Sequence, residues 1–237
     1  MKIWWKKKSH LAEILVLGAH PDDAELLAGG SIAKMASIGK KVIIADMTQA
    51  ELSTNGSKAL RKKETSRASE ILKIHNRVNL GLKDGFLNRD SSLCDEIVAL
   101  IREVKPRIIL GPPLGCRHPD HEALARVLKE AVFFSGLKKY LPNLPYCKRP
   151  NIINYFEVEG VKPNFCIDIS QFFEIKMQAI KAYESQFILG KKSTKTYINT
   201  GIVSMVERRC RDWGEKLGVE FAEPFLCETP LLLDSFI

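Results

Sequence analysis

The sequence predicts an α/β protein with a Rossmann-like, doubly wound and mainly parallel sheet, helices on both faces and an elaborated C-terminal part. Short β-branched runs alternate with amphipathic segments through the first half of the chain, which is the pattern of βαβ units. The 237 residues are 45% apolar and 27% charged, close to globular averages. Two clusters of acids and histidines each follow a predicted strand. These observations together indicate an α/β enzyme or binding protein.

The elements of the first half follow one another in the order βαβαβαβ. Strands are expected at 14–17, 42–47, 78–80 and 107–110, and helices at 31–38, 60–72 and 93–104. Gly39 is placed as the C-terminal stop of the first helix. The helix at 93–104 has apolar residues at helical spacing, and Pro106 then forces the chain out of the helix.

The second half is less regular. Residues 142–150 are rich in Pro, Asn and Lys and are expected to form a long loop. Strands at 154–158 and 165–169 and helices at 172–183 and 202–217 are expected beyond it. The polar stretch GKKSTKTYINTG (190–201) has no periodicity and is predicted to be an irregular active-site flap. We expect residues 1–10 to form a basic tail and residues 11–237 to form a single domain.

Composition and charge exclude several classes of protein. No apolar run approaches the roughly 18 residues that a membrane span needs. The start of the chain mimics a secretory signal, but Glu13 interrupts its apolar part, so we expect a cytoplasmic protein. The six cysteines are dispersed without a C-x-x-C pair, so neither a zinc ribbon nor a disulfide scaffold is indicated.

The chemistry is concentrated in two short segments about 100 residues apart. GAHPDDAE follows the first strand and RHPDHE follows the fourth, and they contain the candidate residues His20, Asp22, Asp23, Glu25, His118, Asp120, His121 and Glu122. In a doubly wound sheet, ligands bind beyond the carboxyl ends of the strands where the strand order reverses. We therefore expect the two clusters to meet there. Two imidazoles and one carboxylate are a typical catalytic zinc set, because they leave a coordination position open.

Two alternatives are weighed against this interpretation. Acids at helix starts are common caps, so either cluster alone could be a set of solvated loop charges. The net charge of +8 also raises the possibility of a nucleotide- or nucleic-acid-binding module. The chain has no G-x-G-x-x-G after its first strand and no P-loop, and its lysines do not interleave with aromatics as a stacking platform. We therefore expect no nucleic acid partner.

The quoted motifs resemble the LmbE-like, or PIG-L, family of metal-dependent N-deacetylases. A-H-P-D-D after a strand and a later H-P-D-H are its hallmarks, and both are intact here. Further segments resemble the subgroup that deacetylates N-acetylglucosaminyl-malate in bacillithiol biosynthesis, namely AELSTNGS, RKKE, RHPDHE, KPNFCIDIS and AYESQF. The resemblance implies a hydrolase that removes acetate from an N-acetylglucosaminide. A deacetylase of another amino sugar is the alternative.

The resemblance also implies roles for the clustered residues. His20, Asp23 and His121 would hold Zn²⁺, although such a ligand set also accepts Fe²⁺. Asp22 would be the general base, and His118 with Asp120 would form a second polar pair, with Asp120 fixing the tautomer of His118. Relatives of this subgroup are often oligomers, which implies a homo-oligomer.

Further positions concern the substrate. Arg61 and Arg117 match family positions near the pocket, and a guanidinium can bind a carboxylate bidentately, so both are expected to bind an acidic substrate. Relatives carry a flap tyrosine at the position of Ile202, and Tyr197 is expected to replace it as a hydrogen-bond donor. The subgroup's Pro-Asp-Arg-Gly becomes Lys-Asp-Gly-Phe at 83–86, which retains only the acid, Asp84.

Overall fold

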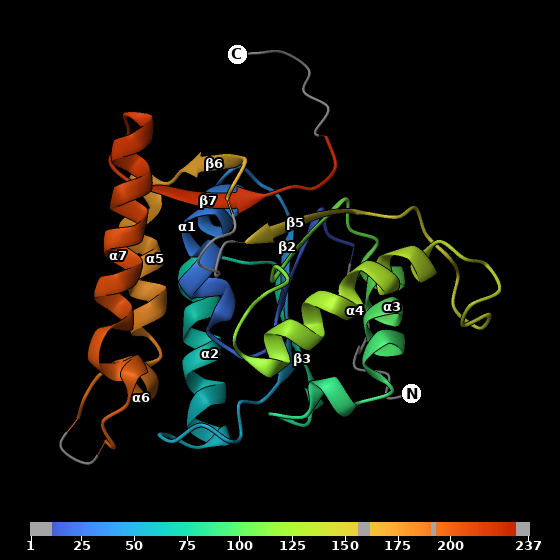
Figure 1. The fold of residues 1–237 in the computed structure, drawn as a ribbon, viewed down its shortest axis with the longest axis horizontal. Coiled ribbons are helices and arrows are strands. Elements are labelled where there is room, and N and C mark those ends of the chain that lie inside the picture. Colours follow the sequence, from blue (N-terminus) through green and yellow to red (C-terminus); the bar gives the residue numbers. More distant parts are fainter. Residues whose placement is uncertain (1–10, 156–161, 191–192, 231–237) are drawn as a thin grey trace.

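One mixed sheet of seven strands is flanked by helices in the computed structural model, which describes residues 11–155, 162–190 and 193–230 (Figure 1). The strand order is β3-β2-β1-β4-β5-β7-β6. The first five of these strands run parallel, and β7 runs antiparallel to both of its neighbours. The order 3-2-1-4-5 is the doubly wound arrangement, so the predicted fold class is confirmed.

The bounds of the elements follow the chain order. The strands are β1 (Ile14–Gly18), β2 (Val42–Thr48), β3 (Asn76–Leu82), β4 (Ile108–Gly111), β5 (Asn151–Tyr155), β6 (Phe165–Asp168) and β7 (Ala222–Leu226). The α-helices are α1 (Asp23–Ser37), α2 (Lys58–Leu72), α3 (Leu93–Val104), α4 (Pro119–Ser135), α5 (Phe173–Lys181), α6 (Glu184–Phe187) and α7 (Tyr197–Leu217). Two short 3-10 helices lie at Leu87–Arg89 and Ser170–Phe172.

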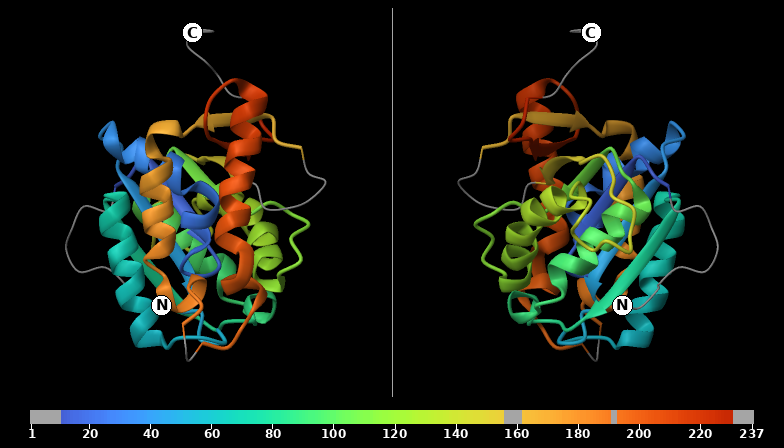
Figure 2. Two further views of the ribbon diagram at one scale, coloured as in Figure 1. Left: turned by 90° about the vertical axis from the view of Figure 1, so that its left-hand side faces the viewer. Right: turned by 90° about the vertical axis from the view of Figure 1, so that its right-hand side faces the viewer.

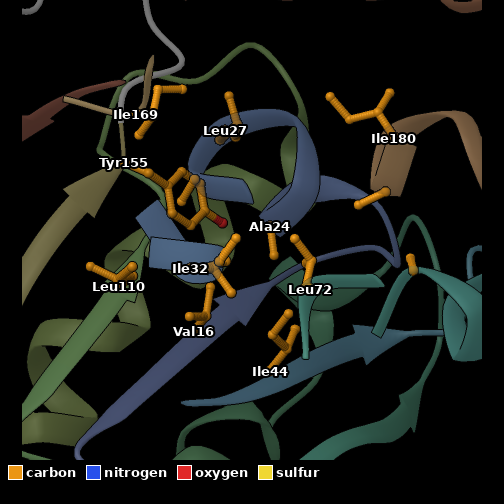
Figure 3. Close-up of a cluster of buried hydrophobic side chains, with 14 of the residues drawn as sticks. Val16, Ala24, Leu27, Ile32, Ile44, Leu72, Leu110, Tyr155, Ile169 and Ile180 are labelled. Atoms are coloured by element: carbon orange, nitrogen blue, oxygen red, sulfur yellow. The ribbon is translucent and has the colours of Figure 1, made fainter. Parts of the chain in front are cut away.

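The helices form two layers, one on each face of the sheet. In Figure 1, α1, α2, α5 and α7 lie on one side and α3 and α4 on the other, and Figure 2 shows the two faces in turn. Alternate residues of β1 point into opposite layers, since Val16 packs with α1 and α2 while Leu15 and Leu17 pack with α3 and α4. Figure 3 shows Val16 and Ile44 beneath Leu27 and Ile32 of α1. Burial on both faces explains why β1 is an apolar run without alternation.

The register of β1 positions the functional site. Ile14 lies beside Val42 of β2 and Ile108 of β4, so β1 is central and both of its neighbours run parallel to it. The chain leaves β1 for β2 on one side and reaches β4 only after crossing to the other side, so the strand order reverses between β1 and β4. The loops that follow these two strands therefore begin at the same edge of the sheet.

Several elements start elsewhere than the sequence predicts or were not predicted. Helix α1 begins at Asp23, eight residues before the expected start at 31. The paired glycines Gly29 and Gly30 do not interrupt the helix. Gly30 allows close packing there, since a Cβ at this position would lie only 2.7 Å from the side chain of Ile169. Helix α4 and strand β7 were not predicted at all. Helix α4 begins directly in the acid-rich cluster, where Pro119 is suited to a first helical turn.

The end of the predicted flap is helical, which corrects the prediction for 197–201. Helix α7 begins at Tyr197, five residues before the expected start. The Thr196 hydroxyl accepts a hydrogen bond from the Asn199 amide, and the Asn199 side chain accepts one from the Thr196 amide. This reciprocal capping box starts the helix without any apolar periodicity. Strand β5 also starts three residues earlier than predicted, and residues 156–158 of the expected strand lie outside the described residues.

A buried ion pair joins the C-terminal part to α1. Glu223 of β7 accepts hydrogen bonds from the backbone amides of Gly30 and Ser31, at 3.0 and 2.7 Å. Lys176 of α5 donates to Glu223 at 2.6 Å and to the carbonyl oxygen of Leu26 at 2.9 Å. Both charged side chains are at most 1% exposed, so the C-terminal elements are an integral part of the packing around α1.

Within the described residues, no helix is long and apolar enough to span a membrane. The predicted basic tail at 1–10 lies outside those residues. The single domain expected for 11–237 stays a prediction.

Candidate active site

The two acid-rich clusters meet at the carboxyl edge of the sheet, as expected from the strand order. His20 follows β1, whereas His118 and His121 lie at the start of α4, after β4. The ring centroid of His20 lies 4.7 Å from that of His118 and 5.3 Å from that of His121. Residues about 100 positions apart in the sequence therefore form one site.

Three side chains in this site present atoms at the spacing of a metal coordination sphere. Nδ1 of His20 lies 3.2 Å from Nε2 of His121. Oδ1 of Asp23 lies 3.3 Å from that Nε2, and its Oδ2 lies 3.8 Å from Nδ1 of His20. Ligands at zinc distances of about 2.1 Å in tetrahedral geometry lie about 3.4 Å apart. The spacing and chemistry of this donor set therefore fit a divalent metal ion.

Two other groups of side chains that contain His20 have possible ligand atoms within 4.8 Å of one another. His118 can join His20 and His121, and Asp84 with Asp120 can join His20. The second grouping uses the opposite ring nitrogen, since Nε2 of His20 contacts Oδ1 of Asp84 at 3.0 Å and Oδ2 of Asp120 at 3.5 Å. A ring that donates through Nε2 leaves Nδ1 free as a ligand.

Carboxylates dominate the electrostatics around His20. Burial by itself would lower the pKa of His20, but Asp120, Asp84 and Asp23 outweigh it and raise the pKa to about 10. Burial would likewise raise the pKa of Asp84, but its hydrogen bonds with His20 and the Leu52 amide lower it to about 2. A site with this excess of ionised carboxylates favours a bound cation.

The adjacent aspartates at the start of α1 point in different directions because of an unusual backbone. Asp22 has φ 128° and ψ −22°, a left-handed conformation that costs free energy for a residue with a Cβ. It precedes the first helical residue, Asp23, whose Oδ2 accepts a hydrogen bond from the His20 amide at 2.9 Å. The backbone strain therefore separates Asp22 from the carboxylate that faces the histidines.

Arg61 of α2 holds the separated carboxylate. Its Nη1 donates to Oδ2 of Asp22 at 2.7 Å and to the Pro21 carbonyl oxygen at 2.6 Å, while Nη2 donates to the Ser53 hydroxyl at 3.1 Å. Burial raises the pKa of Asp22, and the Arg61 guanidinium opposes that rise. Arg61 itself is only 5% exposed. Its guanidinium thus already has three protein partners, and the substrate contact expected from the sequence stays a prediction.

The pair formed by His118 and Asp120 also differs from the expectation. It is the backbone amide of Asp120 that donates to Nδ1 of His118, at 3.3 Å. The Asp120 carboxylate instead accepts hydrogen bonds from the amides of Gly85 and Leu87, at 2.7 and 3.1 Å. Because His118 is the N-cap of α4, the helix start rather than a carboxylate selects its tautomer, with the proton on Nε2.

A second buried network lies beside the site. Arg77 of β3 forms a two-pronged ion pair with Asp46, with both N–O distances at 2.8 Å, and a further ion pair with Glu25. The Tyr183 hydroxyl donates to Oε1 of Glu25 at 3.0 Å. This network connects α1, β2 and β3 with the turn between α5 and α6. It also accounts for Glu25, the acid of the first cluster that does not face the histidines.

The histidines open into a cavity of about 480 Å³. Its lining includes every residue with a predicted metal, catalytic or substrate role except Asp120, together with Ile202. The Arg117 guanidinium lies 5.5 Å from the centroid of the Tyr197 ring. No carboxylate lies within ion-pair distance of Arg117 among the described residues. Arg117 is therefore an exposed cation that faces the cavity.

Tyr197 is in the cavity wall, but its hydroxyl is directed along its own helix. That hydroxyl lies 3.8 Å from Sδ of Met205, and the residue is 63% exposed. The structure therefore presents the ring of Tyr197 to the cavity rather than a donor aimed at the histidines. This differs from the expectation that its hydroxyl replaces the missing tyrosine at Ile202.

Sequence reasoning missed two neighbours of the candidate metal ligands. Asp84 was noted as a retained acid but was not assigned to the site, although an acid directly after a third parallel strand was a usable signal. Cys116 has its Sγ 3.5 Å from Nδ1 of His121, and no sequence pattern indicated this contact.

Comparison with known proteins identifies the family of this chain. A family model described as PIG-L: GlcNAc-PI de-N-acetylase matches residues 15–132. Diacetylchitobiose deacetylase of Thermococcus kodakarensis is 30% identical over 194 residues, which cover 74% of this chain and 70% of that protein. A probable N-acetyl-alpha-D-glucosaminyl L-malate deacetylase 2 of Bacillus cereus is 32% identical over 186 residues, covering 73% and 83%.

A solved structure extends the similarity over almost the whole chain. A conserved protein of Thermus thermophilus superposes with a TM-score of 0.86 and 33% identity, covering 96% of this chain and 99% of that one. The matched family segment contains both histidine clusters and the arginine that holds Asp22. The chain belongs to the PIG-L family of LmbE-like deacetylases.

Proposed function

We propose that this protein is a zinc-dependent hydrolase that removes acetate from an N-acetylglucosaminide. N-acetylglucosaminyl-malate, in bacillithiol biosynthesis, is the leading candidate substrate. The proposal depends on one observation: ligand atoms of His20, Asp23 and His121 converge in a cavity that Asp22 also lines. The names of the relatives, which include deacetylases of a glucosaminyl malate and of diacetylchitobiose, support this substrate class.

The chemistry divides between the metal and the protein. A zinc ion held by His20, Asp23 and His121 would polarise the amide carbonyl and lower the pKa of water. Asp22 accepts the proton of the attacking water, and its raised pKa makes it a stronger base than a solvated aspartate. The same group can then return the proton to the departing amine.

His118 is suited to stabilise charge on the substrate. Nδ1 of His118 accepts a hydrogen bond from the Asp120 amide, so the neutral ring carries its proton on Nε2. This Nε2 can donate a hydrogen bond to the carbonyl oxygen of the substrate as negative charge develops there. Burial and the neighbouring imidazoles of His20 and His121 lower the pKa of His118, which favours this neutral form.

Arg117 supports an acidic aglycone. Its guanidinium is exposed, lines the cavity and has no carboxylate partner in the part of the chain described. A carboxylate such as those of malate can be bound there by charge-assisted hydrogen bonds.

One observation favours a second candidate, a neutral amino-sugar substrate. The ring of Tyr197 is exposed in the cavity wall, and Arg117 covers part of it. An aromatic ring of this kind can pack against a second sugar, as a diacetylchitobiose-like substrate would require. The cytoplasmic location and the homo-oligomer expected from the sequence stay predictions.

Acetate release separates the candidates. The zinc-loaded enzyme is assayed with N-acetylglucosaminyl-malate, diacetylchitobiose and free N-acetylglucosamine. We expect the malate conjugate to have the highest kcat/KM, and Arg117→Ala to reduce that preference by about 10- to 150-fold, the value of a hydrogen bond to a charged group. Arg208→Ala is the matched control, because Arg208 is exposed on α7 and does not line the cavity.

Three other results would contradict the leading candidate or support the second one. Equal kcat/KM for the malate conjugate and free N-acetylglucosamine would contradict the acidic aglycone. A preference for diacetylchitobiose would support the neutral amino-sugar candidate. Absence of acetate release from all three compounds, with zinc bound, would contradict the proposed activity on this substrate class.

A further inference from the structure

A second cavity lies beside the histidine site and is larger than it. A groove of about 710 Å³ runs between α2 and the edge strand β3, compared with about 480 Å³ for the catalytic cavity. In the sheet, β3 pairs only with β2, and α2 packs mainly against α5 and α1 (Figures 1 and 2). This packing leaves the space between α2 and β3 open.

One stripe of α2 forms the wall of the groove. The members of the stripe are polar and recur every three or four residues, so they share one face of the helix. They are Lys58, Lys62, Thr65, Ser66, Ser69, Glu70 and Lys73. Arg77 and Asn79 of β3 lie on the opposite side, and His75 lies at the end near Lys73.

The charges along this groove are predominantly positive. Lys58, Lys62 and Lys73 are exposed, and none has a carboxylate within ion-pair distance among the described residues. Two carboxylates line the groove. Asp46 is already paired with Arg77, and the exposed Glu70 is outnumbered by the three lysines of the lining. A groove with this charge excess concentrates anions.

We propose that this groove is a second ligand-binding site, which takes an elongated small molecule with several anionic groups. Its volume lies within the usual range of about 300–1,000 Å³ for small-molecule sites. Lys62 and Lys73 are separated by about 16 Å along the helix axis, at 1.5 Å per residue. The ligand therefore carries its phosphate, sulfonate or carboxylate groups at both ends rather than at a single centre.

The groove and the catalytic cavity share a wall. Arg61 and Pro21 line the groove, and Arg61 also lines the catalytic cavity. The Arg61 guanidinium holds both the Asp22 carboxylate and the Pro21 carbonyl oxygen. An anion that enters the groove at this end attracts the guanidinium in competition with Asp22. Occupancy of the groove is therefore expected to change turnover in the catalytic cavity.

A fluorescent polyanion tests binding directly. Pyrene-1,3,6,8-tetrasulfonate is titrated with the zinc-loaded full chain, and its anisotropy is measured at low and at physiological salt. Sulfonates are weaker metal ligands than carboxylates or phosphates, which limits binding at the histidines. We expect saturable binding of one probe per chain. Binding should be weakened about tenfold in Lys62→Ala/Lys73→Ala, because each exposed ion pair with a sulfonate contributes only modestly.

The matched control is Lys138→Ala/Lys139→Ala, which removes the same charge from exposed lysines after α4. We expect this variant to bind the probe as the unmodified protein does. Absence of saturable binding would overturn the proposal, as would equal weakening in both double variants, because that would indicate diffuse charge. Self-association of the protein that blocks the probe would overturn it as well, and would assign the groove to a subunit contact.

Steady-state kinetics test the coupling. We expect saturating probe to change kcat for acetate release in the unmodified enzyme and in the Lys138→Ala/Lys139→Ala control. The same probe concentration should leave kcat unchanged in Lys62→Ala/Lys73→Ala. A kcat that is insensitive to a bound probe in the unmodified enzyme would overturn the coupling through Arg61, while the anisotropy result would still decide the binding site.

Discussion

Nη1 of Arg61 lies 2.7 Å from Oδ2 of Asp22 and 2.6 Å from the carbonyl oxygen of Pro21. One guanidinium therefore fixes both the carboxylate and the backbone just before it, at a residue whose φ is 128°. A strained backbone persists only where its surroundings hold it in place. Arg61 is thus part of the structure that directs Asp22 away from Asp23.

The neighbouring aspartates give the sharpest test of the site, because they are chemically identical and differ only in geometry. We expect Asp22→Asn to retain bound zinc while its kcat falls about 10²- to 10⁴-fold, which is the usual contribution of a general base. Asp23→Asn should lose zinc, because only two protein ligands would remain. Metal analysis and acetate release measured on both variants check the assignment, and a reversed pattern would exchange the two roles.

Replacing Arg61 should act through Asp22. Arg61→Lys keeps the charge but cannot contact Asp22, Pro21 and Ser53 together. We expect kcat to fall up to about 10²-fold from the misplaced carboxylate, with little change in KM. Arg67→Lys is the control, because Arg67 lies on the same helix in an exposed ion pair with Glu184. A rise in KM with kcat unchanged would instead support the substrate-binding role expected from the sequence.

Asp84 should control metal affinity without being one of the three proposed ligands. Its Oδ1 lies 3.0 Å from Nε2 of His20, so it orients the ring whose Nδ1 faces the site. Loss of such an orienting carboxylate typically weakens metal binding about 10- to 100-fold. We expect Asp84→Asn to show this change in a competitive chelator titration, whereas Asp212→Asn, on the exposed face of α7, should not. Unchanged affinity in Asp84→Asn would mean that backbone contacts alone orient His20.

Much of the fold could be predicted because its signals are local. Strand β1 is buried on both faces and is an uninterrupted apolar run, and α3 has a clear apolar stripe. The missed elements depend on tertiary contacts instead. Strand β7 contains Glu223, and an acid in a short apolar segment predicts an exposed position. Its burial depends on Lys176 and on two backbone amides of α1, which are distant in the sequence. Long-range pairing of this kind leaves no periodicity in the sequence.

The site shows the same limit. The two clusters, with His20 and Asp23 in one and His121 in the other, could be placed together from the sequence. Each cluster begins at the end of a parallel strand. The partners of the arginines could not be predicted. Sequence position places Arg61 near the pocket, but only the packing of α2 against α1 shows that its guanidinium is occupied by Asp22. The N-capping role of His118 was hidden for the same reason, since α4 itself was missed.

The buried pair of Lys176 and Glu223 should be a major contributor to stability. Lys176→Met leaves an unpaired carboxylate at 1% exposure, and breaking a buried pair in this way typically costs about 3–5 kcal/mol. Lys129→Met is a close control, because Lys129 and Glu228 have the same 2.6 Å separation on the surface, where such pairs contribute about 0–1 kcal/mol. Urea unfolding measures both. An equal loss of unfolding free energy in the two variants would show that burial does not determine how much this ion pair contributes to stability.

The hydroxyl and the ring of Tyr197 have different surroundings, and only the hydroxyl was given a role from the sequence. Its hydroxyl lies 3.8 Å from Sδ of Met205, while its ring supports the Arg117 guanidinium at the cavity wall. We therefore expect Tyr197→Phe to retain kcat within about threefold, a change of about 0.6 kcal/mol in the barrier. Tyr197→Ala should raise KM about two- to fivefold, because it also removes a cation–π contact of about 0.5–1 kcal/mol that positions Arg117. Steady-state acetate release with the malate conjugate distinguishes the two variants. A loss of about 10² to 10³ in kcat for Tyr197→Phe is what removal of an oxyanion donor produces, and it would show that the hydroxyl turns toward His118 when substrate binds.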